Sequence, residues 1–456
     1  MANTYISRAA TGNVTSDKTW TFSFWLKRGD LNRTQTIFMH ENAASHNEKF
    51  QLELQSDNTF RVSVYDGSTE FNYDTNMLFR DTSGWYNVVV RWDTTQSTST
   101  DRVRIYVNGS QITFDNANGS TATMPNQNFA LDLGEKIMVW GRYQASSPGA
   151  YFNGSLSYCQ YADGQSYAPT TFGSIDSVTG QWKINTNATV TYGDNGFFIL
   201  KNGNRVINDA GNSSGNFAVS GGTLTNTEDC PDNVFATMNP LDNYYPNFNL
   251  AYGNTSVGAG NGPRTYLLAT MGLAPTGKYY WEIKLQGQQN ASESNSVLFG
   301  ISQKSTGSAT EDLTDGVASS TVIDGSGRVY VEGSLAGTFG SSYEPSTVMC
   351  LAYDAVNNKM YFGKDGTWLN SGDPTSGSTG TGAFTPTATN GAYNNIYMPC
   401  WGVNYNSGYS VAFNFGNGSF NTSAVSSAGT NASSNGIFEH DVPTGYTALS
   451  TKGLNL

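Results

Sequence analysis

The chain has 456 residues, and its 36 Asp and Glu residues exceed its 24 Lys and Arg residues, which gives a formal net charge of −12. This balance argues against nucleic acid or an anionic membrane as a main partner, because phosphate backbones and anionic lipids are bound chiefly through Lys and Arg. Charged residues make up only 13% of the chain, so the surface must consist mainly of uncharged polar residues and tyrosine.

The sequence shows no sign of membrane insertion or export. No segment approaches the ~20 apolar residues needed to cross a bilayer, and the first residues lack the basic start and apolar stretch of a secretory signal. We predict synthesis in a reducing cytoplasm, although the Gly, Ser, Thr, Asn and aromatic content is typical of extracellular β proteins. Four widely spaced cysteines are predicted to be reduced and buried as small hydrophobic residues: Cys159, Cys230, Cys350 and Cys400.

Alternating segments predict a two-sheet antiparallel sandwich over residues 1–168. Residues 19–28, TWTFSFWLKR, place aromatic side chains and a leucine on one face and Trp25 on the other, so we expect a central strand with both faces covered. In RVRIYVNG, residues 102–109, apolar and polar residues alternate, and Asn108-Gly109 supplies the left-handed positions of a tight hairpin turn.

The rest of the chain divides into a connector at 169–248, a second alternating block at 249–435 and a tail at 436–456. The connector is less periodic but contains several aromatic residues, so we expect it to be structured and to pack on its neighbours. The second block predicts another antiparallel sandwich, with turns at Asn357-Asn358 and Asp365-Gly366. The tail is too short to form a domain, and we expect it to dock on the body or on a neighbouring molecule.

The order of motifs in the first block resembles a laminin-G-like or concanavalin-like sandwich, through TFSFWLKR, GWYNVVVRWD, RVRIYVNG and YFNGSLSYCQYADG. The second block resembles a SPRY domain, through GKYYWEIKL, VLFGIS, CLAYDAVNNKMYFGKDG and AFNFGN. The connector motifs DSVTGQWKI, YGDNGFFIL and CPDNVFATMNPL and the ending HDVPTGYTALST are similar to virion surface proteins of tailed phages, marine ones especially.

This resemblance implies a virion structural protein, such as a tail fibre or a fibre associated with the head or tail, that displays its sandwiches to bind a host-cell glycan or protein receptor. It implies synthesis in the host bacterial cytoplasm, a place on the virion surface, contacts with other virion proteins and a homo-oligomer, with trimers common among phage fibres. Because the first sandwich begins close to Met1, we expect attachment through the C-terminal segment or a domain face. The alternatives are a capsid or tail decoration protein that binds only other virion subunits, and a polysaccharide depolymerase.

Catalytic machinery is not evident in the sequence, and we predict that the protein is not an enzyme. A glycosidase needs two carboxylates on either side of the scissile bond. The candidates are Glu53, Glu70 and Asp74, of which the last two share a face only if their segment is a strand. We interpret Glu53 and Glu70 as solvated strand positions, and His40 and His46 as solvated residues of a polar loop.

No cofactor is predicted, with calcium left open because lectin-like sandwiches often hold it in their rim loops. Asp66, Asp93 and Asp163 lie at predicted loop ends. There they would either ligate calcium or cap turns through backbone hydrogen bonds.

Exposed aromatic rings are the candidates for ligand binding, because their flat faces stack on sugars or bury against proteins. The better candidates for surface positions are Trp368, just after a turn, and Tyr405 and Tyr409 in the NYNSGYS loop, although a simple packing role is slightly favoured even for these. Four tryptophans within strand patterns are instead predicted to be core residues: Trp25, Trp85, Trp281 and Trp401.

Overall fold

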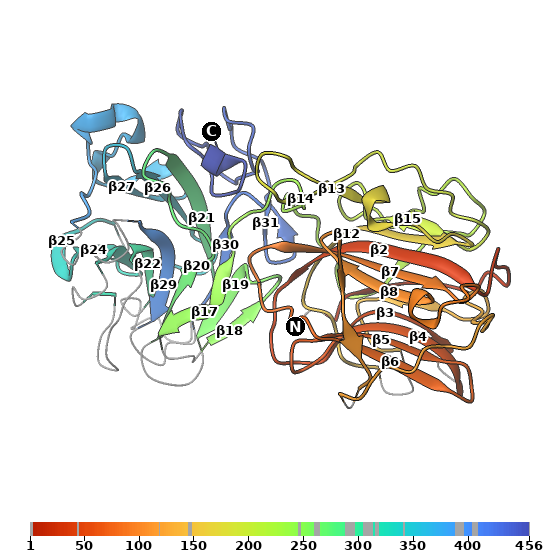
Figure 1. Cartoon of the computed structure of the whole chain (residues 1–456). Coiled ribbons are helices and arrows are strands. Elements are labelled where there is room, and N and C mark those ends of the chain that lie inside the picture. The colour runs from red at the N-terminus through yellow and green to blue at the C-terminus, as the bar shows by residue number, and fades with distance from the viewer. Residues whose placement is uncertain are drawn as a thin grey trace. The chain divides into compact units, whose positions relative to one another are not determined.

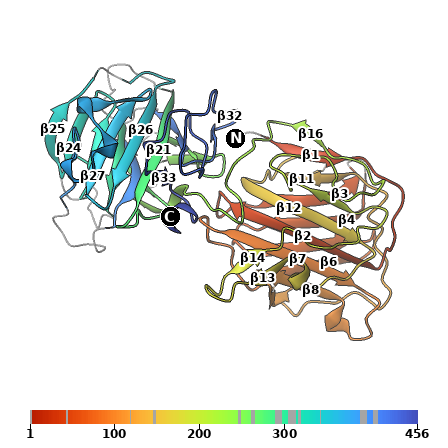
Figure 2. The ribbon, with the colours of Figure 1, turned by 90° about the horizontal axis from the view of Figure 1, so that it is seen from above.

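A computed structural model describes residues 3–42, 45–117, 119–144, 148–244, 248–259, 265–287, 297–303, 313–314, 319–340, 343–387, 396–403 and 409–455, the side chains of 41–42, 45–48 and 243–244 excepted. The described chain is nearly all β, as predicted, and forms two compact units, Met1–Leu224 and Thr225–Leu456 (Figures 1 and 2). The segment that the sequence suggested as a connector is thus shared between the units. Within the described residues, no helix is long and apolar enough to cross a membrane.

The first unit is a sandwich of two antiparallel sheets, coloured red to yellow-green in Figure 1. The larger sheet has the strand order β10-β6-β5-β4-β3-β11-β1-β16. Its strands are β1 (Tyr5–Arg8), β3 (Gln35–Asn42), β4 (Ser45–Leu54), β5 (Phe60–Tyr65), β6 (Glu70–Thr75), β10 (Phe114–Asp115), β11 (Met138–Trp140) and β16 (Ala218–Gly221).

The smaller sheet of this unit has the order β15-β12-β2-β7-β8-β9. Its strands are β2 (Thr19–Arg28), β7 (Trp85–Asp93), β8 (Val103–Val107), β9 (Ser110–Ile112), β12 (Gly154–Asp163) and β15 (Phe197–Ile199). A separate hairpin joins β13 (Gly173–Ile175) to β14 (Trp182–Ile184), and two 3-10 turns are η1 (Ser99–Asp101) and η2 (Pro169–Thr171).

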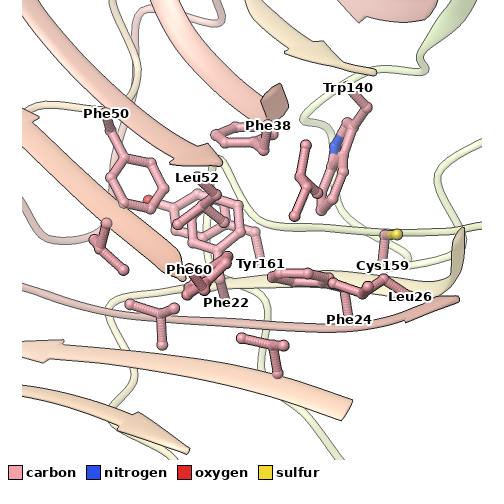
Figure 3. Close-up of a cluster of buried hydrophobic side chains, with 14 of the residues drawn as sticks. Phe22, Phe24, Leu26, Phe38, Phe50, Leu52, Phe60, Trp140, Cys159 and Tyr161 are labelled. Carbon is pink, nitrogen blue, oxygen red and sulfur yellow. The ribbon is translucent and has the colours of Figure 1, made fainter. Parts of the chain in front are cut away.

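Aromatic side chains from both sheets fill the core of the first unit (Figure 3). Trp20 on β2 stacks on Trp92 of β7, with ring centroids 5.4 Å apart and planes 2° from parallel. From the same strand, Phe22 lies 4.8 Å from Phe38 and 5.0 Å from Phe50 on the opposite sheet. Strand β2 lies between β12 and β7 and buries residues on both faces, which confirms the prediction of a central strand.

The outer face of β7 and β8 is covered by the first part of the connector. Phe172 packs there on Val89, and Nε1 of Trp182 donates a hydrogen bond of 3.1 Å to Oδ1 of Asn87. The Trp182 ring also lies against the predicted turn between β8 and β9, where a Cβ on Gly109 would come within 2.3 Å of the ring. Glycine is therefore required at this turn both by its φ of +80° and by the close approach of the indole.

The second unit also contains two large antiparallel sheets. One has the order β17-β20-β29-β22-β23-β24-β25, with β17 (Met238–Tyr244), β20 (Thr265–Ala269), β22 (Val297–Ser302), β23 (Thr321–Asp324), β24 (Arg328–Val331), β25 (Ser334–Thr338) and β29 (Met398–Val403). The other has the order β18-β19-β30-β21-β26-β27-β28, with β18 (Phe248–Ala251), β19 (Ser256–Ala259), β21 (Lys278–Gly287), β26 (Val348–Asp354), β27 (Lys359–Lys364), β28 (Thr367–Trp368) and β30 (Ser410–Asn414). Short elements complete the unit: β31 (Ser419–Phe420), β32 (Ser423–Ala424), β33 (Thr447–Ala448), η4 (Leu369–Ser371), η5 (Pro374–Thr379) and η7 (Gly453–Asn455).

Several local predictions for the two units are confirmed. Asn357-Asn358 lies between β26 and β27, and Asp365-Gly366 lies between β27 and β28. The four cysteines are free, and the predicted burial is confirmed for three of them but not for Cys230, which is only partly buried. The four tryptophans predicted to lie in the cores are buried: Trp25, Trp85, Trp281 and Trp401.

The C-terminal segment docks on the outer face of the sheet that contains β21. Phe438 and Tyr446 pack there in one cluster with Tyr280, and β33 pairs in parallel with β21. Close to the chain's last residues, the N–H of Thr451 donates a hydrogen bond of 2.8 Å to the carbonyl of Val234. These two residues are 217 positions apart, so the segment that follows β33 is joined directly to the early part of the unit.

A buried carboxylate anchors this segment. Glu282 on β21 is 0% exposed and accepts hydrogen bonds from the backbone N–H groups of Glu439 (2.9 Å) and His440 (2.8 Å). It also accepts from the Tyr280 hydroxyl (3.0 Å) and from Nδ2 of Asn414 (3.1 Å). Burial raises the pKa of Glu282 to about 7, and the four donors oppose a larger rise because they stabilise the charged form.

This anchor predicts a specific dependence of stability on pH. An unfolded Glu282 ionises near 4.5 whereas the folded one keeps its proton to about pH 7, so the folded state binds more protons in this window. The free energy of unfolding should therefore fall as pH rises from about 4.5 to about 7, relative to a Glu282→Gln variant, which does not titrate.

Urea unfolding of both proteins between pH 4.5 and 8 measures this difference. Since Gln turns an N–H₂ group toward backbone donors, the variant should also be less stable by about 1–3 kcal/mol. Glu344→Gln, at an exposed position of the same unit, serves as the control and should not change the pH profile. Parallel wild-type and Glu282→Gln profiles over this window would contradict the prediction.

Candidate functional site

The two sheets of the first unit differ in what lies on their outer faces. The connector covers the six-stranded sheet at β7 and β8, as described above, whereas β4, β5 and β6 of the eight-stranded sheet present polar side chains on their outer face. Along each of these strands, alternate residues such as Leu52, Val62 and Tyr73 are in the core. Because successive side chains of a strand point to opposite faces, the residues between them lie on the outer face.

Nine side chains on β4–β6 form a patch that we name the polar sheet face. The register of the strands arranges them in three cross-strand rows of three residues. The rows are Glu53–Arg61–Asp74, Gln51–Ser63–Asn72 and Lys49–Tyr65–Glu70. Since neighbouring strands lie about 4.8 Å apart, the side chains form a compact patch that spans two strand spacings.

The charged residues of this face are paired with one another. Nε and Nη2 of Arg61 donate to the two carboxylate oxygens of Asp74 at 2.5 and 2.7 Å, and Nη1 lies 3.8 Å from Oε1 of Glu53. Nζ of Lys49 lies 3.0 Å from Oε1 of Glu70. Burial raises the pKa of Glu53, and the nearby Arg61 opposes this rise. For Glu70, partial burial acts to raise the pKa, but the hydrogen bond and charge of Lys49, with the hydrogen bond from Asn72, together lower it.

Amide side chains complete the network around the carboxylates. Nε2 of Gln51 donates to Oε2 of Glu53 at 2.6 Å and to the Thr36 hydroxyl at 3.2 Å, and Nε2 of Gln55 donates to Oε1 of Glu53 at 2.5 Å. The central residue, Ser63, is 1% exposed, and its hydroxyl has no hydrogen-bond partner among the described residues. The face is thus a pre-ordered set of polar groups on rigid strands, the arrangement that binding sites require.

The structure revises the interpretation of the acidic candidates. Residues 70–75 do form strand β6, so Glu70 and Asp74 share a face. Glu70 is exposed, as expected, but Glu53 is only 8% exposed and hydrogen-bonded, so its interpretation as a solvated position is wrong. The cause is the crowding of Glu53 by amide and guanidinium groups from its own and the neighbouring strand, which single-strand alternation does not reveal.

The histidine interpretation is also wrong for His40. This residue lies on β3 and is 0% exposed in the first unit, because its cross-strand partner Phe50 places it on the core side. Burial lowers the pKa of His40 to about 3, so it is neutral at physiological pH. The side chain of His46 lies outside the described residues.

The acids considered for calcium are bonded to protein donors. Asp66 accepts from the backbone N–H groups of the turn that follows it, and Asp93 accepts from the Thr95 hydroxyl at 2.6 Å. Asp163 accepts from the N–H groups of Thr15 and Asn195 at 2.6 and 3.1 Å. These bonds match the turn-capping alternative, and in the described part of the chain no three His, Cys, Asp or Glu side chains are grouped to hold a metal.

The aromatic candidates of the second unit have different environments. Trp368 on β28 is partly buried, with its ring centroid 6.4 Å from those of both Tyr280 and Tyr361. Tyr409 is 1% exposed and packs in the core, so the prediction of a surface position is wrong for this residue. Tyr405 lies outside the described residues.

Sequence reasoning did not identify the polar sheet face as a site. Its signal was nevertheless present, since KFQLEL, FRVSVY and EFNYDT each alternate core residues with polar ones. What the sequence does not state is the register that places Arg61 between Glu53 and Asp74.

Comparisons with known proteins agree with this architecture. Residues 1–160 match the Laminin_G_3 family, described as the concanavalin A-like lectin/glucanases superfamily. No curated protein matches the chain. The predicted all-β fold class is confirmed, and the first sandwich has the concanavalin-like fold shared by lectins and glucanases.

Similar solved structures include three from different organisms. The SPRY domain of human HERC1 is 18% identical, with a TM-score of 0.30, over 39% of this chain and 96% of that domain. A heptameric SAP-like pentraxin from Limulus polyphemus is 15% identical, with a TM-score of 0.28, over 44% and 90%. The CBM40 of a Ruminococcus gnavus IT-sialidase, bound to α2,3-sialyllactose, is 14% identical, with a TM-score of 0.24, over 34% and 89%.

Replacing Arg61 by Met tests the charge network. The pKa of Glu53 should rise further, because burial already raises it and Arg61 opposes that rise. The free energy of unfolding should fall by about 1–3 kcal/mol, since two carboxylates lose a shared cation. Carboxyl ¹³C NMR titration and denaturant unfolding measure these effects.

Arg33→Met is the matched control, because the Arg33 side chain is 49% exposed in its pair with Asp30. It should change stability by no more than about 0.5 kcal/mol. An unchanged Glu53 titration in Arg61→Met would show that the guanidinium does not act on this carboxylate.

Proposed function

We propose that this chain is a non-enzymatic, carbohydrate-binding protein of a tailed-phage virion surface, and that the polar sheet face is its glycan site. The observation that carries the proposal is the set of nine polar side chains in register on three strands, on the outer face opposite the core. The concanavalin-like fold of residues 1–160, which lectins and glucanases share, supports the same class of ligand.

The chemistry of the polar sheet face suits a sugar. Carbohydrate hydroxyls both donate and accept hydrogen bonds, and the face offers carboxylate and amide acceptors together with amide and cationic donors. Tyr65, at the edge of the face, adds a partly exposed aromatic ring that can lie against a sugar ring. Because the strands and ion pairs already hold these groups in place, little ordering entropy is lost on binding.

The proposed place on a virion is supported by sequence motifs and composition rather than by the polar sheet face. The connector and C-terminal motifs resemble tailed-phage surface proteins, and a bacterial cytoplasmic origin agrees with the free cysteines beside an extracellular type of composition. We expect copies of the chain to assemble on the particle as a homo-oligomer, for example a trimer. Such an assembly would make weak glycan contacts effective through avidity. In the second unit, Trp368 offers a further ring for receptor contact. The alternative role is a decoration protein that binds only other virion subunits.

Binding of purified protein to immobilised glycans tests the proposal. Asn72→Ala, on the polar sheet face, should weaken binding about fivefold or more, the effect of one lost hydrogen bond of about 1 kcal/mol. Asn187→Ala is the matched control, because this exposed residue belongs to the connector rather than to the polar sheet face. Binding should persist in EDTA, since the proposed site uses no metal.

Equal loss in the two variants, or binding to no glycan, would contradict the proposed site. Cryo-electron microscopy of the particle then tests the virion role. Projection of the first unit into solvent agrees with receptor binding, whereas burial of both units against virion subunits favours the decoration role.

One observation keeps a polysaccharide hydrolase as a second candidate. Glu53, whose pKa burial raises, shares the polar sheet face with Asp74, as the acid and base of a glycosidase would. Arg61 lies between them and occupies both oxygens of Asp74, which disfavours a water-activating role for that carboxylate. Release of reducing ends from a bound polysaccharide, abolished by Glu53→Gln, would support the hydrolase.

A further inference from the structure

Resting on the proposed glycan site, we infer that the polar sheet face selects uncharged glycans and rejects those that carry carboxylate or sulfate groups. The observation behind this inference is that both cations of the face are already committed to carboxylates of the same face. Ligand charge, rather than the identity of a particular sugar, is thus the property on which the site discriminates.

Recognition of an anionic sugar normally uses an arginine fork, because two parallel N–H groups match the two oxygens of a carboxylate or sulfate. The fork of Arg61 is occupied in this way by Asp74, at 2.5 and 2.7 Å. Its remaining terminal nitrogen lies 3.8 Å from Glu53. A ligand anion would have to displace a carboxylate that is fixed on the adjacent strand.

The second cation of the face is neutralised too. Nζ of Lys49 lies 3.0 Å from Glu70, and the Lys49 side chain is only 21% exposed. Glu70 is 47% exposed and also accepts a hydrogen bond from Asn72, so the carboxylate is the more accessible partner of the pair. A ligand that approaches this row therefore meets the negative charge first.

The balance of charge on the face is negative. Three carboxylates stand against two cations among the nine side chains, and Asp57 adds another negative charge near Arg61. Like charges brought into contact at a partly buried surface repel more strongly than in bulk water. Neutral hydroxyls, in contrast, can donate to these carboxylates and accept from the amides without such a penalty.

Matched pairs of probes test this inference: a soluble neutral glucan with its carboxymethyl derivative, and lactose with sialyllactose, measured by calorimetry in low salt. Where the protein binds the neutral probe of a pair, it should bind the anionic probe of that pair at least tenfold more weakly. Raising the salt concentration should reduce the difference in affinity between the neutral and the anionic probe, because salt screens the repulsion.

Two variants then remove negative charge from the face. Glu70→Gln releases Lys49 at an exposed position, and the double variant Glu53→Gln/Asp74→Asn releases Arg61. Each should increase binding of the anionic probe severalfold, whereas Asp194→Asn, an exposed position outside the face, should not. Glu70→Gln keeps the test decisive if the double variant does not fold.

The outcomes separate this inference from the function on which it rests. If anionic probes bind as tightly as neutral ones, or if Glu70→Gln leaves the preference unchanged, charge selection is overturned while the glycan site stands. If no probe binds, the glycan site itself fails and the inference fails with it.

Discussion

The two-residue period of strands β4, β5 and β6 is the constraint on which the first unit depends. Leu52, Val62 and Tyr73 can enter the aromatic core only in one register, and that register assigns the intervening residues to the outer face. A slip of one residue would exchange the two sets, moving charged groups into the core. The burial that stabilises the sandwich therefore also sets the position of Arg61 between two carboxylates.

This dependence explains how much of the protein could be predicted from sequence. The fold class, the central strand at 19–28 and the turn at Gly109 all follow from local patterns, because periodicity and turn chemistry act over a few residues. Burial of Glu53 and His40 was not predictable in this way. It arises from cross-strand partners, and the sequence of one strand does not specify which residues of another strand will face it.

The same limit applies to the candidate sites. Aromatic residues after turns are natural candidates because loops often carry function, yet Tyr409 packs in the core and Trp368 lies partly buried against Tyr280. The polar sheet face instead lies within regular strands, where alternation of polar and apolar residues by itself indicates only ordinary solvation of the outer side chains. Recognising it required the register, since only adjacency shows that the polar residues are bonded to one another.

The direct link between Val234 and Thr451 has a consequence for how the chain is made. Synthesis runs from the N-terminus, and domains generally fold as units while later residues are still being added. The first unit can complete its sandwich while the ribosome is still translating the second. The second must wait until its last strand has left the exit tunnel, and during this interval the apolar surface that Phe438 and Tyr446 will cover is open to chaperones and to other nascent chains.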